Sequence, residues 1–174
     1  TKILNTTLNH NGKIYDIIQT ADGGFAFTGY AYNTKPGILL GKLNSNGEIL
    51  WLNTYETANN SVGHCLLETY EGHFLVGGES FNGAEDDNMI LIKTDAAGNE
   101  TWTKVFYTSG NDRISSIIET ADGEYVFTGN YSSSYQTAII KTDKNGTLIW
   151  EKVYPDIQSR CISETWDGGY IVTG

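Results

Sequence analysis

The stretch Thr20-Ala21-Asp22-Gly23-Gly24-Phe25 decides the fold, because it returns three times along the chain. Each copy has a threonine, then a turn that contains an acid and a glycine, then an aromatic residue: Thr69-Tyr70-Glu71-Gly72-His73-Phe74, Thr120-Ala121-Asp122-Gly123-Glu124-Tyr125 and Thr165-Trp166-Asp167-Gly168-Gly169-Tyr170. Successive threonines are 49, 51 and 45 residues apart. A period of this size is the signature of a repeat architecture.

Two further series of residues keep the same period. One is a lysine followed nine residues later by a tryptophan, in the pairs Lys42 and Trp51, Lys93 and Trp102, and Lys141 and Trp150. The other is a single glycine that follows each repeated stretch, at Gly29, Gly78, Gly129 and Gly174. We interpret both series as structural repeat positions, since three independent series with one period do not arise by chance.

Each unit is predicted to contain four short strands, A to D. In the third unit these are residues 114–119, 125–128, 137–141 and 147–154. The runs are rich in β-branched and aromatic residues, and they are bounded by Asp-Gly and Asn-Gly turns, in which glycine adopts a positive φ without steric cost. No window shows a sustained helical period with caps.

Four antiparallel strands in about 45–50 residues match one blade of a β-propeller. The chain is therefore predicted to be an all-β propeller with a D strand, three complete ABCD units and a final A and B. One repeat region covers residues 1–174, with units at roughly 12–55, 61–106, 112–154 and a partial unit at 157–174. Neighbouring blades must stack to bury their faces, and the repeated tryptophan suits that role. We expect the repeats to continue beyond both ends, as a fragment of a larger ring.

The segment from Asp86 to Lys104, which contains Leu-Ile-Lys-Thr-Asp followed by Gly98 and Trp102, resembles a known group of repeats. It is similar to the Asp-Gly-Gly-Tyr repeat propellers of secreted and cell-surface proteins of archaea and bacteria. That resemblance implies a propeller and no particular function. A more distant likeness is to quinoprotein dehydrogenases, which implies a quinone and Ca²⁺ in a full ring. The matching segment here, Asp143, Gly146 and Trp150, has a different spacing.

Composition narrows the range of partners and favours export. A formal net charge of −10 and an isoelectric point near 4.6 argue against nucleic acid and anionic membranes. No apolar run approaches the roughly 18–20 residues that a membrane span needs. The polar composition and an excess of Asn-x-Ser/Thr sequons predict an extracellular or cell-surface location. The sequons begin at Asn5, Asn59, Asn99, Asn130 and Asn145.

The two cysteines share one repeat position, four residues before a repeat threonine. That position holds Asp16, Cys65, Ser116 and Cys161 in successive units. It falls on the innermost strand, where small residues fit. Because Cys65 and Cys161 lie two blades apart, beyond the reach of a disulfide, both are predicted to be reduced, buried and unreactive.

No pattern predicts a catalytic, metal or cofactor site. The acidic segment Glu85-Asp86-Asp87-Asn88 offers oxygen ligands for Ca²⁺ but lacks the spacing of a calcium loop, so it is interpreted as a solvated loop. The three histidines, His10, His64 and His73, occupy unrelated repeat positions and lack further zinc ligands nearby. We expect each repeated lysine to lay its stem on the sheet and its ammonium near the indole of its paired tryptophan.

The leading functional hypothesis is a non-catalytic scaffold or adhesion module of an exported protein. Recognition would lie in the variable B–C connections, which are predicted to hold the tyrosines Tyr30, Tyr32, Tyr131 and Tyr135. Protein or glycan surface partners, and self-association through open blade edges, are expected. One alternative is a carbohydrate-binding propeller that uses these tyrosines and exposed tryptophans. A second alternative is part of an enzyme of quinoprotein type.

Overall fold

The computed structural model describes residues 12–32, 36–56, 60–81, 87–106, 110–131 and 136–174. All regular structure in these residues is β-strand. No helix in these ranges is long and apolar enough to cross a membrane. The expected D strand at residues 1–8, together with His10, Glu85, Asp86 and Tyr135, lies outside the described residues.

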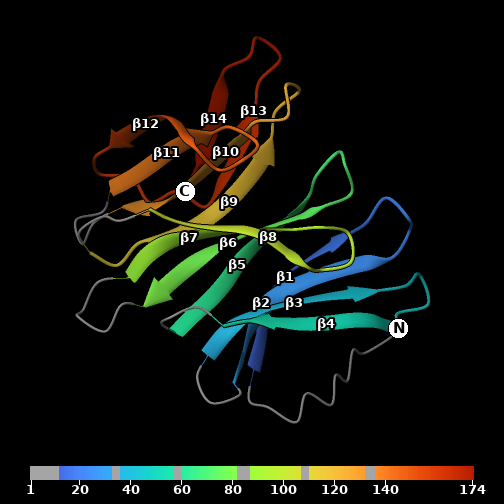
Figure 1. The fold of residues 1–174 in the computed structure, drawn as a ribbon. Helices are drawn as coiled ribbons and strands as arrows, with labels where there is room; N and C mark the ends of the chain where they lie inside the picture. Colours follow the sequence, from blue (N-terminus) through green and yellow to red (C-terminus); the bar gives the residue numbers. More distant parts are fainter. Residues whose placement is uncertain (1–11, 33–35, 57–59, 82–86, 107–109, 132–135) are drawn as a thin grey trace.

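The strands form three four-stranded antiparallel sheets and one two-stranded sheet, which follow one another in chain order (Figure 1). The first sheet contains β1 (Gly12–Gln19), β2 (Phe25–Tyr32), β3 (Pro36–Leu43) and β4 (Ile49–Tyr55). The second contains β5 (Asn60–Glu68), β6 (Phe74–Phe81), β7 (Asp87–Thr94) and β8 (Glu100–Phe106). The third contains β9 (Arg113–Glu119), β10 (Tyr125–Tyr131), β11 (Gln136–Thr142) and β12 (Leu148–Tyr154). The last pairs β13 (Cys161–Glu164) with β14 (Tyr170–Thr173).

Each sheet is a meander whose strands pair in sequence order, which confirms the predicted all-β fold of propeller blades. The repeated turns work as expected. In the first blade, the backbone N–H of Gly23 donates to the carbonyl of Thr20 at 2.8 Å, and the glycine has φ of 79°. The same turn recurs at Gly72, Gly123 and Gly168, where a positive φ favours glycine.

The first strands of successive blades lie side by side, β1 against β5, β5 against β9 and β9 against β13. We call these four the inner strands. Side chains link them directly. Asp16 Oδ2 accepts the Leu66 N–H at 2.9 Å, and Ser116 Oγ accepts the Ile162 N–H at 3.3 Å. Residues at one repeat position therefore connect each blade to the next.

A second link joins neighbouring blades at the A–B turns. Glu68 ends β5, and its Oε2 accepts the backbone N–H of Ala21 at 2.8 Å. Glu119 ends β9 and accepts the backbone N–H of Tyr70 in the same way at 2.6 Å. In both cases the glutamate that ends one inner strand holds the A–B turn of the preceding blade, so the same bond fixes the relative position of successive blades.

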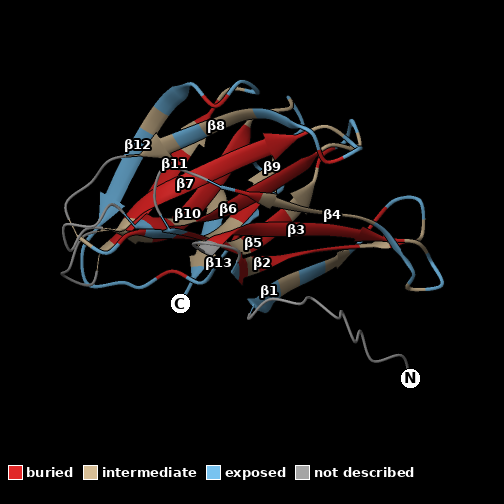
Figure 2. Cartoon of the chain, turned by 60° about the horizontal axis from the view of Figure 1, so that its bottom comes forward, coloured by how far each residue is buried: buried red, intermediate tan, exposed pale blue. Residues whose placement is uncertain are grey.

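The core lies between the blades, and the middle strands carry most of it. Figure 2 shows β2, β3, β6, β7 and β10 largely buried, whereas β1 and β12 are mostly exposed. One cluster joins Leu75 and Leu91 of the second blade to Phe127 and Ile140 of the third. Burial of such side chains on both faces of each middle strand supplies the main stabilisation.

The tryptophan series packs between blades as predicted. Trp51 contacts Phe74, Trp102 contacts Tyr125, and Trp150 contacts Tyr170, with ring centroids 5.8, 6.5 and 6.0 Å apart. In every pair the tryptophan is on the fourth strand of one blade. Its partner is the aromatic residue that begins the second strand of the next blade. All three indoles are half-buried.

The lysine series behaves differently from the prediction. Each lysine lies opposite its tryptophan in the sheet, but its ammonium turns toward the A–B turn of its own blade. Lys42 Nζ binds Asp22 at 2.8 Å, Lys93 Nζ lies 4.0 Å from Glu71, and Lys141 Nζ lies 2.6 Å from Glu124. A carboxylate attracts the ammonium more strongly than an indole face does, so the expected lysine–indole contact is wrong.

The prediction of reduced, buried cysteines is confirmed for Cys65 and wrong about burial for Cys161, and their low reactivity stays a prediction. Both thiols are free. Cys65 is buried between β5 and the next inner strand, with Sγ 3.9 Å from the Ile114 carbonyl, and burial raises the pKa of its thiol. Cys161 is exposed. Among the described residues no further blade lies against β13, so the same repeat position faces solvent there.

Candidate functional site: a polar pocket on the inner strands

Each inner strand of the first three blades contains one extra residue that interrupts its pairing with the second strand. In the first blade Ile14 pairs with Gly29 and Asp16 with Thr28, which leaves Tyr15 between them. The same shift leaves His64 unpaired in β5 and Ser115 unpaired in β9. All three residues lie five positions before a repeat threonine, and Arg160 has that place in the fourth unit. Such bulges re-aim side chains and are common beside binding sites.

The repeated glycine makes this irregularity sterically feasible. A Cβ on Gly78 would meet the carbonyl oxygen of Val62, the residue two before His64, well inside van der Waals contact. Gly29, Gly129 and Gly174 face the equivalent oxygens of Lys13, Arg113 and Gln158. The glycine series is therefore explained by close approach of two backbones at the bulge.

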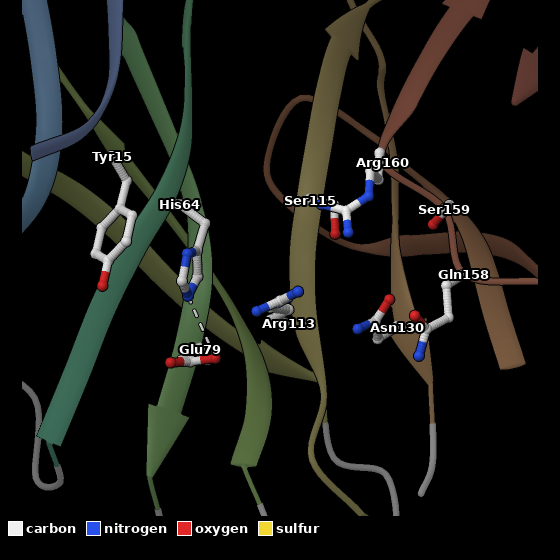
Figure 3. A pocket seen from close by; sticks show the side chains of 9 residues that line it. All are labelled: Tyr15, His64, Glu79, Arg113, Ser115, Asn130, Gln158, Ser159 and Arg160. Carbon is white, nitrogen blue, oxygen red and sulfur yellow. Dashed lines mark ion pairs between the residues drawn. The ribbon is translucent and has the colours of Figure 1, made fainter. Parts of the chain in front are cut away.

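The side chains at this repeat position in all four units line one pocket of about 400 Å³ (Figure 3). Its volume falls within the range of roughly 300–1,000 Å³ that is usual for small-molecule sites. Figure 3 shows Tyr15 and His64 on one side and the residues of the third and fourth units on the other. The lining comprises Tyr15, His64, Glu79, Arg113, Ser115, Asn130, Gln158, Ser159 and Arg160. We call it the inner-strand pocket.

Both arginines of the chain line this pocket, although the chain has nine lysines elsewhere. Arg113 begins β9, and Arg160 directly precedes β13. Within the described residues neither guanidinium forms an ion pair or a side-chain hydrogen bond, and both side chains are exposed. In a protein with a net charge of −10, the pocket therefore concentrates positive charge.

A histidine and a glutamate form the opposite wall. His64 Nε2 lies 3.3 Å from Glu79 Oε2, and both side chains are largely buried (Figure 3). The two atoms are off the geometry of a hydrogen bond, and His64 Nε2 has no other partner in the described part of the chain. His64 Nε2 is itself buried, so this wall presents the Glu79 carboxylate as the acceptor that a polar ligand could engage.

Three tyrosines extend the pocket along its first-blade side. The ring centroid of Tyr15 lies 6.1 Å from that of Tyr30 and 5.0 Å from that of His64. The centroids of Tyr30 and Tyr32 are 5.7 Å apart. Tyr15 is 49% exposed and Tyr32 is 45% exposed, so each keeps ring surface open to solvent. A second pocket of about 210 Å³ includes Tyr32 and shares Glu79 with the first. The aromatic row therefore connects two adjoining hollows.

The structure divides the tyrosines that were predicted to act in recognition. Tyr30 and Tyr32 are in strand β2 rather than in a loop, and they belong to the aromatic row. Tyr131 ends β10 and packs against the core cluster between the second and third blades, where partial burial raises the pKa of its phenol. The neighbouring residue Asn130 lines the pocket. Because successive side chains of a strand point to opposite faces, Tyr131 faces away from the pocket.

The prediction of a loop position for these tyrosines is wrong because the second strands extend beyond the repeated glycine. The expected end of the third-unit strand was Thr128, whereas β10 continues to Tyr131. Sequence reasoning also missed Tyr15, Arg113 and Arg160. Counting five residues back from each repeat threonine would have found the bulge position, since it holds Tyr15, His64, Ser115 and Arg160.

A metal site does not emerge from the described side chains. No group of three or more His, Cys, Asp or Glu side chains in these ranges could hold an ion. The interpretation of the acidic segment 85–88 as a solvated loop is wrong for its described residues, because Asp87 and Asn88 begin strand β7 and Asn88 is buried. The turns at Asp95 and Asp143 use their carboxylates to accept backbone N–H groups two and four residues ahead, as expected for turn chemistry.

Comparison with known proteins defines the fold and leaves the function open. No protein-family model and no curated protein sequence matches the chain. A crystal structure of a protein of unknown function from Bacteroides caccae is similar, with a TM-score of 0.61 and 12% identity over 93% of this chain and 53% of that one. A crystal structure described as the eukaryotic initiation factor is also similar, with a TM-score of 0.56 and 11% identity over 88% and 35%.

The chain spans about half the length of the first of these proteins and about a third of the second. At such identities the likeness concerns the fold alone. The class is therefore all-β, built of four-stranded antiparallel propeller blades. The resemblance to the Asp-Gly-Gly-Tyr repeat proteins stays a prediction.

Proposed function

We propose that this chain is a non-catalytic glycan-binding module of an exported or cell-surface protein, and that the glycan occupies the inner-strand pocket. One observation carries the proposal: every unit contributes the side chain at one repeat position to a single polar pocket beside a row of tyrosines. A sugar ring has apolar faces and a polar edge. It therefore matches a site in which an aromatic surface adjoins many hydrogen-bonding groups.

The pocket supplies both kinds of contact. Tyr15 is 49% exposed and supplies the aromatic surface. Glu79 can accept hydrogen bonds from hydroxyl groups, and the amides of Asn130 and Gln158 can both donate and accept.

The test is a glycan array followed by calorimetry on the best ligand. Tyr15→Ala should weaken binding about tenfold or more, by analogy with the truncation of an aromatic anchor in an interface. Tyr70→Ala is the matched control, because Tyr70 is 77% exposed and lies on a turn away from the pocket lining. Equal losses in both variants, or no binding to any glycan, would contradict the proposal.

A second candidate is a protein-binding scaffold that uses the A–B turns. Tyr70 and Trp166 share one repeat position on these turns, with 77% and 99% of their surface exposed. Exposed aromatic residues are frequent anchors at protein interfaces. For this function the expected pattern reverses: Tyr70→Ala and Trp166→Ala would abolish capture of a protein partner, and Tyr15→Ala would leave it intact.

The extracellular location rests on composition. The chain is acidic and rich in polar residues, and two of its sequon asparagines, Asn99 and Asn145, are exposed at C–D turns. Both are sterically accessible to a glycosylating enzyme. Protease treatment of intact cells that express the parent gene should degrade the module. Protection until the cells are lysed would place it inside the cell.

A further inference from the structure

We infer that the inner-strand pocket recognises an acidic saccharide, and that Arg113 and Arg160 bind the carboxylate of a uronic acid while Tyr15 stacks on its ring. This inference rests on the proposed glycan-binding function and specifies its ligand class. It starts from the placement of charge. The chain contains two arginines, and both line this one pocket from different units.

The residue type is as informative as the charge. Arginine presents a planar fork of donors that matches a carboxylate in two parallel hydrogen bonds, whereas lysine acts as a point charge. At the repeat position of Arg113, the other units have Lys13, Val62 and Gln158. At the repeat position of Arg160, they have Tyr15, His64 and Ser115. Repeat architecture therefore demands no arginine at either position, so a structural role in the blade does not explain them.

The local electrostatics favour an anion. Neither guanidinium has an ionic partner among the described residues, whereas the repeat lysines Lys42, Lys93 and Lys141 all lie beside a carboxylate. Glu79, the acidic residue of the lining, lies beside His64 on the opposite wall. The guanidiniums thus remain available to a ligand, and the overall negative charge of the protein would repel an acidic polymer anywhere else on its surface.

The pocket also has the right division of surfaces for a sugar acid. Figure 3 shows Tyr15 and the two arginines on different sides of the hollow, with Glu79 between Tyr15 and Arg113 and with Asn130 on the arginine side. A ring stacked on Tyr15 would direct its equatorial groups across the pocket, toward the guanidiniums. A simple anion such as phosphate would use the arginines and leave the tyrosine without a role.

The experiment compares two probes of matched shape by calorimetry, digalacturonic acid and the neutral digalactose. The chain should bind the acidic disaccharide at least about tenfold more tightly, since hydrogen bonds to a charged group are stronger than those between neutral groups. Arg113→Gln and Arg160→Gln should each remove most of that preference for the acidic disaccharide over the neutral one. Lys144→Gln is the control, because it removes the same charge from an exposed turn outside the pocket.

Two further arms make the outcome decisive. Arg113→Lys keeps the charge and removes the fork, so it should lose most of the preference if recognition is bidentate. A sulfated disaccharide should bind more weakly than the uronate. Equal binding of acidic and neutral sugars, or equal binding of sulfate and carboxylate, would overturn the inference and leave the proposed function standing. Absence of binding to every saccharide would instead contradict the proposed function itself.

Discussion

Trp102, on the fourth strand of the second blade, packs against Tyr125, which begins the second strand of the third blade, with ring centroids 6.5 Å apart. The indole also lies against Gly146, in the next C–D turn. The same relation joins Trp51 to Phe74 and Trp150 to Tyr170. The repeated tryptophan of each blade is thus the residue that packs that blade against the next one.

Removal of this contact should destabilise the fold. We expect Trp102→Ala to lower the free energy of unfolding by about 2–4 kcal/mol, somewhat less than a fully buried tryptophan, because the indole is half-buried. Trp166→Ala is the control, since Trp166 is 99% exposed and its loss should change stability by less than about 0.5 kcal/mol. Urea denaturation measures both, and similar values for the two variants would contradict the packing role.

The repeated glycine should tolerate no side chain. In Gly78→Ala the new Cβ would overlap the carbonyl oxygen of Val62, which is backbone and cannot rotate away. We expect a loss of about 3 kcal/mol or more, or failure to fold, because the inner strand must shift or the bulge must open. A fold that survives this change without loss would show that the bulge is not constrained by the glycine.

Comparison of Gly72→Ala with Gly78→Ala distinguishes the cost of backbone strain from the cost of a steric clash. Gly72 has φ of 76° and open space around its Cβ position, so alanine there costs only the left-handed conformation, about 1–2 kcal/mol. The predicted order of stability is wild type, then Gly72→Ala, then Gly78→Ala. The reverse order would mean that the strain of the turn exceeds the steric clash.

The two cysteines should react at very different rates in the folded protein. Cys161 is exposed, whereas Cys65 is buried and burial raises the pKa of its thiol, so little thiolate forms. We expect a thiol reagent to modify Cys161 rapidly and Cys65 only after unfolding. Peptide mass spectrometry distinguishes the sites. Rapid labelling of Cys65 in native protein would show that the second and third inner strands separate readily.

The sequence predicted the blades because each blade repeats local chemistry. Turns such as Asp22-Gly23 and the alternation of apolar residues act over a few residues, so periodicity exposes them directly. The candidate site could not be found in the same way. It depends on a bulge that aims Tyr15, His64 and Ser115 into one hollow, and these residues share a repeat position but no chemical type. A repeat signal is strongest where residues are alike, whereas a binding pocket needs them to differ.

The lysine series shows the same limit at a smaller scale. Its period was visible, yet the partner of each ammonium depends on where the acid falls in the turn. Lys42 meets Asp22 at the third position of the repeated stretch, whereas Lys141 meets Glu124 at the fifth. The first two copies thus satisfy their lysines with the acid at the third position, and the third copy uses the acid at the fifth, so the periodicity alone does not identify the partner.

The C–D turns give the fold a defined sensitivity to acid. Asp95 accepts hydrogen bonds from the side chain and backbone of Asn99 and from the backbone of Ala97, and these bonds lower the pKa of its carboxyl below the ordinary value of 3.8. Backbone donors of Thr147 and Asn145 lower the pKa of Asp143 in the same way. The first blade uses Asn44 at this position, with equivalent bonds from Asn46 and Glu48 at 2.9 Å. Asparagine therefore builds the same turn without a titrating group.

The sign of the effect follows from proton binding. A carboxyl whose pKa is lower in the folded chain than in the unfolded chain stabilises the fold at a pH above its unfolded-state pKa. This stabilisation is lost as the pH falls through its folded-state pKa. Replacing Asp95 and Asp143 together by asparagine should therefore leave neutral-pH folding intact and reduce the loss of melting temperature between about pH 5 and about pH 3. Asn44→Asp should do the opposite and steepen that loss, because it adds a third such carboxyl. Thermal melts by circular dichroism across this range measure all three proteins. Parallel curves for wild type, double variant and Asn44→Asp would show that the turns do not contribute to acid sensitivity.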